Sequence, residues 1–120
     1  MTNTNVTVIM AFNTKATYNR LTQLEQVQLI TKLTAMFDGA TLTEHMGGYA
    51  MANGEFAVEY SYTIELFDVD PQVAMNHFIT LGQQNNQESI IFNGDLFICN
   101  ILSRKAFLFA LTLQKVSVSV

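Results

Sequence analysis

Hydrophobic and polar positions along the chain predict that strands and helices alternate. The run from Val6 to Phe12 is apolar and β-branched and has the length of a strand, which is typical of a central strand buried on both faces. Thr22 and Glu25 then form a capping-box signature, which predicts a helix from about Gln23 to Phe37. Its apolar stripe, which recurs every three or four residues, comprises Leu24, Val27, Ile30, Leu33 and Phe37.

The next segment predicts a helix end, a short strand and a loop. Gly39 can adopt the left-handed conformation that ends a helix. Ala40 to His45 has the length and threonine content of a short second strand. The glycine-containing stretch HMGGYAMANGE that follows predicts a loop or a hairpin connection.

A third strand and a second helix come next. Phe56 to Leu66 alternates, with apolar residues on one face and Glu59, Ser61, Thr63 and Glu65 on the other. Asp70 as the N-cap and Pro71 at the first helical position predict a helix that ends at about Gln84. The residues that this helix is expected to bury are Val73, Ala74, Phe78 and Leu81.

The C-terminal part predicts a hairpin and a further strand. Glu88–Phe92 and Asp95–Leu102 flank Asn93-Gly94, a pair that suits both left-handed positions of a type I′ turn. The tail ends in alternating valines, which indicate a last strand at Val116, Val118 and Val120.

This order of elements predicts a single ferredoxin-like α+β domain over residues 1–120. Two right-handed βαβ crossovers give an antiparallel sheet with two helices on one face, to which the C-terminal hairpin strand and tail are added. The other face of the sheet would need cover. Because only 13% of the residues are charged, we expect copies of the chain to supply that cover as a dimer or trimer.

Charge and hydropathy exclude several classes of partner. Six Lys and Arg face ten Asp and Glu with no basic stripe, so nucleic acid is not an expected partner. No segment reaches the roughly 18 apolar residues of a membrane span, and the N-terminus lacks the basic region of a signal peptide. We therefore expect a cytoplasmic protein. Its single cysteine, Cys99, lies in an apolar run and is interpreted as a small buried residue, with a reactive thiol as the alternative.

The sequence offers no metal site and none of the common catalytic motifs. His45 and His77 lie in different elements without a Cys or carboxylate at ligand spacing, so no metal is expected. His77 is interpreted as a surface or rim residue, and His45 as a weaker candidate for lining a site. A glycine-rich phosphate loop, a nucleophile elbow and a Cys/His pair are all missing, which disfavours hydrolases, kinases and Rossmann methyltransferases.

Four polar residues around the inner strands are the remaining candidates for a site: Asn13, Tyr49, Glu59 and Gln87. Glu59 is either solvated on an open face or held in a pocket against a cation or hydrogen-bond donor. Tyr49 is a core anchor or a hydroxyl directed at a ligand. Gln87 is a polar strand start or a ligand contact. The residue pattern leaves these alternatives open.

Short motifs that occur in a fixed order along the chain indicate which family the sequence resembles. Ala11-Phe12 ends the first strand, Gly47-Gly48-Tyr49 follows the helix, Glu59 lies in the third strand, and Gln87-Glu88-Ser89-Ile90-Ile91 starts the fourth. Over roughly Val6 to Leu102, the chain resembles the phage S-adenosylmethionine (SAM) lyases, long called SAM hydrolases. The segment between Tyr49 and Glu59 and the C-terminal tail depart from the family pattern.

The resemblance implies a homotrimer with SAM, the substrate, at subunit interfaces. It implies that Glu59 and Tyr49 are catalytic and that Gln87, Phe12 and Asn13 bind substrate. Glu59 would anchor the ammonium or sulfonium, Tyr49 would fix the bent methionine tail, and Phe12 would stack on the adenosine. The substrate carboxylate would attack its own γ-carbon to give methylthioadenosine and homoserine lactone, with no metal, cofactor or nucleophilic side chain. The alternatives are a non-catalytic, PII-like trimeric nucleotide-binding module and a phage-encoded inhibitor of a host enzyme.

Overall fold

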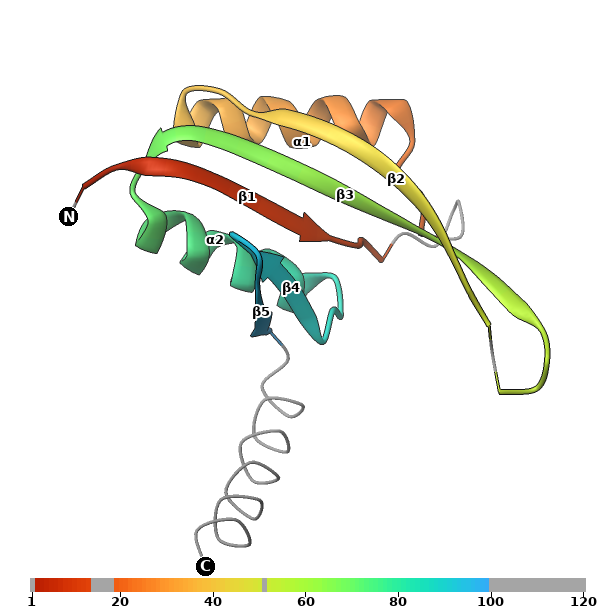
Figure 1. The fold of residues 1–120 in the computed structure, drawn as a ribbon. Helices are drawn as coiled ribbons and strands as arrows, with labels where there is room; N and C mark the ends of the chain where they lie inside the picture. The colour runs from red at the N-terminus through yellow and green to blue at the C-terminus, as the bar shows by residue number, and fades with distance from the viewer. Residues whose placement is uncertain (1, 14–18, 51, 100–120) are drawn as a thin grey trace, which may run out of the picture.

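The described residues form an α+β fold, with a five-stranded antiparallel sheet and two helices (Figure 1). A computed structural model describes residues 2–13, 19–50 and 52–99. The elements are β1 (Thr4–Met10), α1 (Gln23–Phe37), β2 (Thr41–Ala50), β3 (Phe56–Val69), α2 (Pro71–Gln84), β4 (Ser89–Phe92) and β5 (Asp95–Ile98).

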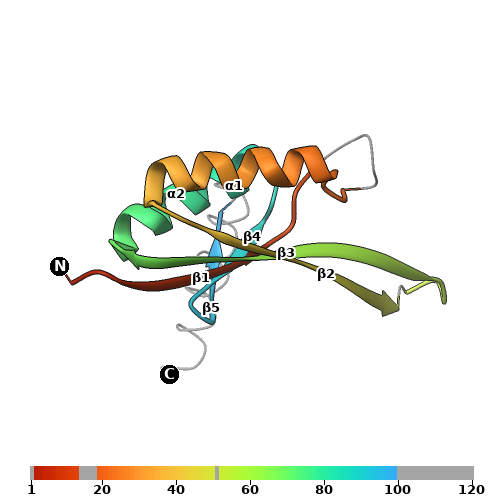
Figure 2. The same ribbon diagram turned by 90° about the horizontal axis from the view of Figure 1, so that it is seen from above.

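The strand order β2-β3-β1-β4-β5 confirms the predicted ferredoxin-like fold. β1 lies in the middle of the sheet and pairs with β3 on one side and β4 on the other. β5 adds an edge through the predicted hairpin. Both helices cover the same face, as Figure 2 shows, and among the described residues no helix lies on the opposite face of the sheet. We call that opposite side the open face.

Capping fixes the helix starts, as the sequence predicts. The Thr22 hydroxyl accepts a hydrogen bond from the Glu25 amide at 3.1 Å, and the Glu25 carboxylate accepts one from the Thr22 amide at 2.9 Å. The Asp70 carboxylate accepts from the Gln72 amide at 2.9 Å. The end of α1 differs from the prediction, because Asp38 rather than Gly39 takes the left-handed conformation, with φ 65°. A short polar side chain tolerates that conformation better than most.

The second strand is longer than predicted. It runs to Ala50, so Gly47-Gly48-Tyr49 are strand residues rather than a loop. Each pairs with a residue of the 14-residue β3, and this cross-strand hydrogen bonding outweighs the poor strand propensity of two glycines. In Figure 1, the β2–β3 hairpin extends well beyond the other strands.

The core lies between the helices and one face of the sheet. Its fully buried members include Val6, Val8, Leu33, Tyr62, Ile64, Leu66, Ala74, Phe78 and Ile90. β1 is therefore buried on one face only, and the expectation of burial on both faces is wrong. Asn5 and Thr7 are exposed because neither α1 nor α2 packs on the open face.

Each predicted apolar stripe is buried only in part. The members that are buried or packed against the core are Leu33 and Phe37 on α1 and Ala74, Phe78 and Leu81 on α2. Leu24 and Val27 on α1 are 66% and 53% exposed, and Val73 on α2 is 52% exposed, so their predicted burial is wrong. Both helices are amphipathic, but the angle at which each packs on the sheet selects which apolar residues are covered. Phe56 and Val58 are also exposed, because the hairpin extends past the helices.

The β4–β5 hairpin forms at the predicted turn, but β5 ends at Ile98 instead of extending toward Leu102, and residues 100–102 lie outside the described residues. Asn93 and Gly94 both have positive φ, 49° and 86°, as a type I′ turn requires. The predicted burial of Cys99 is confirmed. The strand predicted at Val116, Val118 and Val120 lies outside the described residues. Within the described ranges, no helix is long and apolar enough to cross a membrane.

Candidate functional site

A cavity of about 520 Å³ opens on the open face, between the ends of β1 and β3 and the turn that joins α2 to β4. Its polar and small lining residues include Ala11, Glu59, Ser61, Asn86, Gln87 and Glu88. Apolar walls come from β1, β4 and β5. Two residues singled out from the sequence, Glu59 and Gln87, therefore line the same cavity although 28 positions separate them (87 − 59).

The alternation of β3 directs Glu59 to this cavity. Tyr62 and Ile64 face the helices, so Glu59 and Ser61, at odd positions of the same strand, face the open side. In the single chain, the Glu59 side chain is exposed and forms no hydrogen bond or ion pair with another described residue. Its Cα pairs with that of Gly47 on β2. A carboxylate in this position is available to a ligand.

The α2–β4 turn positions Gln87. Its amide N–H donates to the Gly82 carbonyl at 2.9 Å, and its side-chain Nε2 donates to the Asn85 carbonyl at 3.0 Å. Asn86, which lies between Asn85 and Gln87, has a positive φ of 55°, and this conformation reverses the chain direction. The side chain of Gln87 is thus partly buried and held by its own turn.

Asn13 is connected to the same turn through Asn85. The Asn85 Oδ1 accepts from the Asn13 amide at 3.2 Å, while its Nδ2 donates to the Leu81 carbonyl at 2.9 Å. Asn13 therefore lies next to the cavity wall, although its side chain is not among those that line the cavity. The sequence analysis missed Asn85, whose only signal was its place in the polar run that follows α2.

The structure does not bring Phe12 to the cavity. Its ring is 5% exposed and packs edge-to-face on Tyr62, with the ring centroids 5.6 Å apart, on the helix side of the sheet. Its neighbour Ala11 lines the cavity instead. The backbone of Tyr49 lies on β2 and pairs with Ala57 on β3. This pair is two residues closer to the hairpin tip than the Gly47–Glu59 pair.

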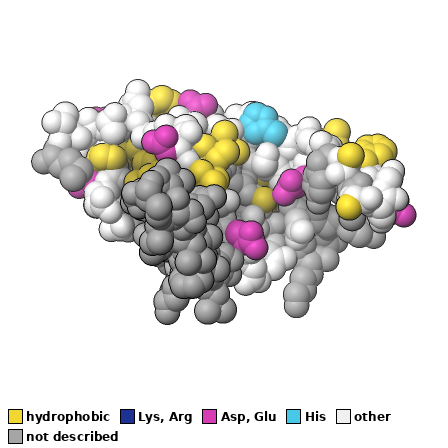
Figure 3. All heavy atoms as spheres, turned by 60° about the horizontal axis from the view of Figure 1, so that its bottom comes forward, with side chains coloured by type: hydrophobic (Ala, Val, Ile, Leu, Met, Phe, Trp, Pro, Cys, Tyr) yellow, Lys and Arg dark blue, Asp and Glu magenta, His cyan; other side chains and the backbone are white. Residues whose placement is uncertain are grey.

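The charge of the cavity is one-sided. Glu59 and Glu88 both line it, and neither Lys nor Arg occurs among its described lining residues. Figure 3 shows the open face obliquely, with several carboxylates in magenta and no dark-blue basic side chain among the described residues in view. Such a site attracts cations and repels phosphates. Among the described residues, no group of three or more His, Cys, Asp or Glu is placed to hold a metal ion.

The two histidines lie elsewhere. On the open face, His45 is exposed and its Nε2 is 2.8 Å from the Thr63 hydroxyl, on the β2–β3 ladder. His77 is partly buried, with Phe37 and Phe78 edge-on to its ring. Burial, and secondly the charge of Lys32, lowers its pKa.

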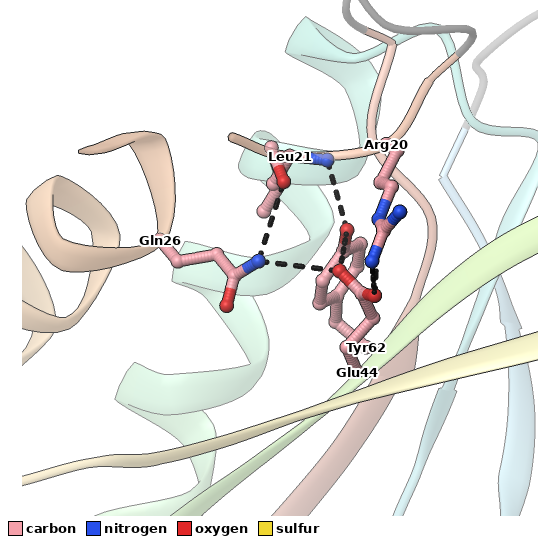
Figure 4. A network of polar contacts seen from close by, with 5 residues as sticks. All are labelled: Arg20, Leu21, Gln26, Glu44 and Tyr62. Atoms are coloured by element: carbon pink, nitrogen blue, oxygen red, sulfur yellow. Dashed lines mark hydrogen bonds and ion pairs between the residues drawn. The ribbon is translucent and has the colours of Figure 1, made fainter. Parts of the chain in front are cut away.

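A second polar cluster lies on the helix side of the sheet (Figure 4). The Tyr62 hydroxyl accepts from the Leu21 amide at 2.8 Å and donates to Glu44 Oε2 at 2.9 Å. Gln26 and Arg20 also donate to the Glu44 carboxylate, and Arg20 lies 2.9 Å from it as an ion pair. The hydrogen bond from Arg20 is the largest cause that lowers the pKa of Glu44. This cluster joins the start of α1 to β2 and β3.

Comparison with known proteins supports the fold. No protein-family profile matches the sequence, and no curated protein is a significant match. Among solved structures, a phage SAM lyase in complex with S-methyl-5'-thioadenosine superposes with a TM-score of 0.52 at 15% identity, over 82% of this chain and 83% of that one. A phage SAM lyase in the apo state gives a TM-score of 0.49 at 17% identity, over 83% of each chain. In its fold, this chain is similar to a phage SAM lyase, as the resemblance in its sequence predicts.

Proposed function

We propose that the protein is a SAM lyase that converts SAM into methylthioadenosine and L-homoserine lactone. The observation that carries the proposal is the cavity on the open face, where Glu59, Glu88 and Gln87 meet without a basic residue among the described lining. Its charge favours a cationic substrate such as a sulfonium over nucleotides with phosphate groups. The fold similarity to a lyase solved with methylthioadenosine supports the same assignment.

The proposed reaction needs little chemistry from side chains. A carboxylate oxygen of the substrate attacks its own γ-carbon, the carbon–sulfur bond breaks, and the bonding electrons leave with sulfur as a neutral thioether. Because an anion and a cation neutralise each other, removing them from water and folding the tail into an attacking geometry lowers the barrier. Glu59 would anchor the cationic end of the substrate, and Tyr49 would hold the bent tail.

This chemistry also supports a homotrimer with the site between subunits. Glu59 is exposed in the single chain and the cavity is open, whereas charge neutralisation is fastest where water is excluded. A neighbouring copy on the open face would close the cavity and supply that environment. Asn13, next to the cavity wall, is the proposed contact to the adenosine; Phe12 would reach the ligand only if its ring left the core.

A Glu59→Gln variant tests the proposal. We expect purified wild-type protein to release methylthioadenosine from SAM, and the variant to show a kcat/KM about 100-fold lower, because a neutral amide cannot balance a buried cation. Chromatographic quantification of methylthioadenosine measures both. The matched control is Glu65→Gln, on the same strand and at the same parity but outside the cavity, which should keep the wild-type rate.

Other results of the SAM assay would favour one of the two alternative functions. SAM that binds and returns unchanged would favour the PII-like module. A protein that does not bind SAM at all would favour an inhibitor of a host enzyme. Full activity of the Glu59→Gln variant would remove Glu59 from the mechanism.

A further inference from the structure

The chain contains two Asn-Gly pairs, Asn53-Gly54 and Asn93-Gly94, and both lie in exposed turns between antiparallel strands. Gly54 has a φ of 87° and Gly94 a φ of 86°, and a Cβ added at either glycine would meet nothing within 4 Å. The two pairs are therefore alike in exposure, in glycine conformation and in the space around the glycine. They differ in the hydrogen bonding of the asparagine side chain.

An Asn-Gly pair can lose ammonia without an enzyme. The backbone nitrogen of the glycine gives its proton to a base in the solvent and attacks Cγ of the asparagine. A carbon–nitrogen bond forms, and the Cγ–Nδ2 bond breaks as ammonia leaves with a proton from the solvent. Water then opens the five-membered succinimide at either carbonyl, which leaves aspartate or isoaspartate. Glycine favours the reaction because it has no Cβ to obstruct the attack.

At the tip of the β2–β3 hairpin, hydrogen bonding prepares Asn53 for this attack. The Asn53 Oδ1 accepts from the Glu55 amide at 3.0 Å. This local bond folds the side chain back along its own backbone, which keeps Cγ near the Gly54 nitrogen. A donor at Oδ1 also stabilises the negative charge that this oxygen gains during the attack.

At the β4–β5 turn, hydrogen bonding holds Asn93 away from the same reaction. Its Oδ1 accepts from the Thr7 amide on β1 at 2.8 Å, and its own amide donates to the Thr7 carbonyl at 2.8 Å. The side chain is thus directed toward a neighbouring strand instead of along its own backbone. Attack by the Gly94 nitrogen would require the side-chain bond to break, which costs free energy before the reaction starts.

We propose that Asn53-Gly54 is a site of spontaneous deamidation, at which the hairpin tip gains a carboxylate while Asn93-Gly94 stays intact. The new charge adjoins Glu55 and is close in sequence to Phe56, which is 75% exposed on the projecting hairpin (Figure 1). A carboxylate there opposes burial of the tip against another surface. The modification does not depend on the proposed lyase activity.

Peptide mass spectrometry of the full-length protein tests the site. Cleavage after glutamate separates the two pairs, because Asn53 falls in the peptide 45–55 and Asn93 in the peptide that begins at Ser89. During incubation of the folded protein at mildly alkaline pH, we expect Asn53 to convert to aspartate and isoaspartate about 10-fold faster than Asn93. That ratio corresponds to the hydrogen bonding that Asn93 must give up.

The same chain in urea is the matched control, since unfolding removes the hydrogen bonds of both turns and leaves the sequence unchanged. Both glycines are followed by an acidic residue, so the two rates should then agree to within about 3-fold. Asn53→Gln keeps an amide but would have to close a larger ring. This variant should therefore lack the acidic form that isoelectric focusing detects in aged wild type.

Equal rates in the folded protein, or faster conversion of Asn93, would overturn the inference. A difference that persists undiminished in urea would overturn it too, because the neighbouring sequence and not the turn would then set the rate. An acidic form that accumulates in Asn53→Gln at the wild-type rate would place the modification elsewhere and would equally overturn it.

Discussion

Tyr62 shows how a single residue joins the core to a polar network. Its ring is fully buried against Phe12, while its hydroxyl reaches Leu21 and Glu44. A buried hydroxyl is stable only when it is hydrogen-bonded. Glu44 provides the acceptor, and the pairing with Arg20 keeps that carboxylate charged.

Stability should therefore depend on pH through Glu44. Its pKa lies below the ordinary value of 4.5 in the folded state, mainly because Arg20 donates a hydrogen bond to it. Charged Glu44 thus adds stability above pH 4.5, and this contribution is lost as the pH falls through the lowered pKa. We expect Glu44→Gln to be less stable than wild type in urea unfolding at pH 7, by about 1 kcal/mol.

The difference in the free energy of unfolding between wild type and Glu44→Gln should shrink as the pH falls below 4.5. Glu55→Gln, which removes an exposed carboxylate at the other end of the β2–β3 hairpin, is the control for the change in net charge. A gap between wild type and Glu44→Gln that stays constant down to pH 3 would show that the charge of Glu44 does not stabilise the fold.

At the scale of elements, the junction of α2 with the strands behind it depends on one glycine. A Cβ added to Gly82 would lie 2.7 Å from the Cys99 Sγ and 3.2 Å from its Cβ. Cys99 is fully buried, and its amide donates to the Glu88 carbonyl at 2.8 Å, so it has little room to move. The absence of a side chain at position 82 therefore allows α2 to lie close to Cys99, which follows β5.

Gly82→Ala should destabilise the protein by about 1–3 kcal/mol, because overpacking outweighs the roughly 1 kcal/mol by which alanine favours a helix. Urea unfolding measures the effect. Gly39→Ala is the control, since a Cβ there meets nothing within 4 Å. Adding Cys99→Ala to Gly82→Ala should recover part of the loss. Purely additive changes would show that the two side chains do not compete for space.

At the scale of the whole molecule, two exposed features favour association with other copies. Neither α1 nor α2 covers the open face, and the projecting hairpin exposes Met46, Phe56 and Val58 at 69%, 75% and 55%. Exposed apolar groups on a projecting hairpin favour contact with another surface. A homotrimer that covers the open face would account for the first feature. Phe56 and Val58 share the parity of Tyr62, on the helix side of the sheet, so the hairpin would need a separate contact with a neighbouring copy.

We expect native mass spectrometry to give three times the chain mass for the wild type. Phe56→Asp should shift the protein toward smaller species and lower lyase activity in parallel, because a charge at a buried contact is costly and the site would be shared. Ala52→Asp, at an exposed position of the turn that joins β2 to β3, is the matched control. A monomeric wild type with full activity would contradict the shared site.

The sequence alone determined the elements and their order. Local signals are contained in neighbouring residues, so the capping box at Thr22, Pro71 at the start of α2 and Asn93-Gly94 in the hairpin each fixed a boundary that the structure confirms. Glu59 and Gln87 could also be singled out, since polar residues beside apolar strands are visible in the sequence.

Tertiary structure decided what depends on distant partners. Leu24 and Val27 are exposed because helix packing, not periodicity, selects the buried face, and Gly47-Gly48-Tyr49 are extended because β3 pairs with them. Only the folded chain brings Asn85 beside Asn13 and shows that Phe12 packs on Tyr62 rather than lining the cavity. The hydrogen bond between Asn13 and Asn85 joins residues 72 positions apart, and no local sequence pattern predicts such a pair. The structure was therefore needed to find the part of the cavity wall that Asn85 holds.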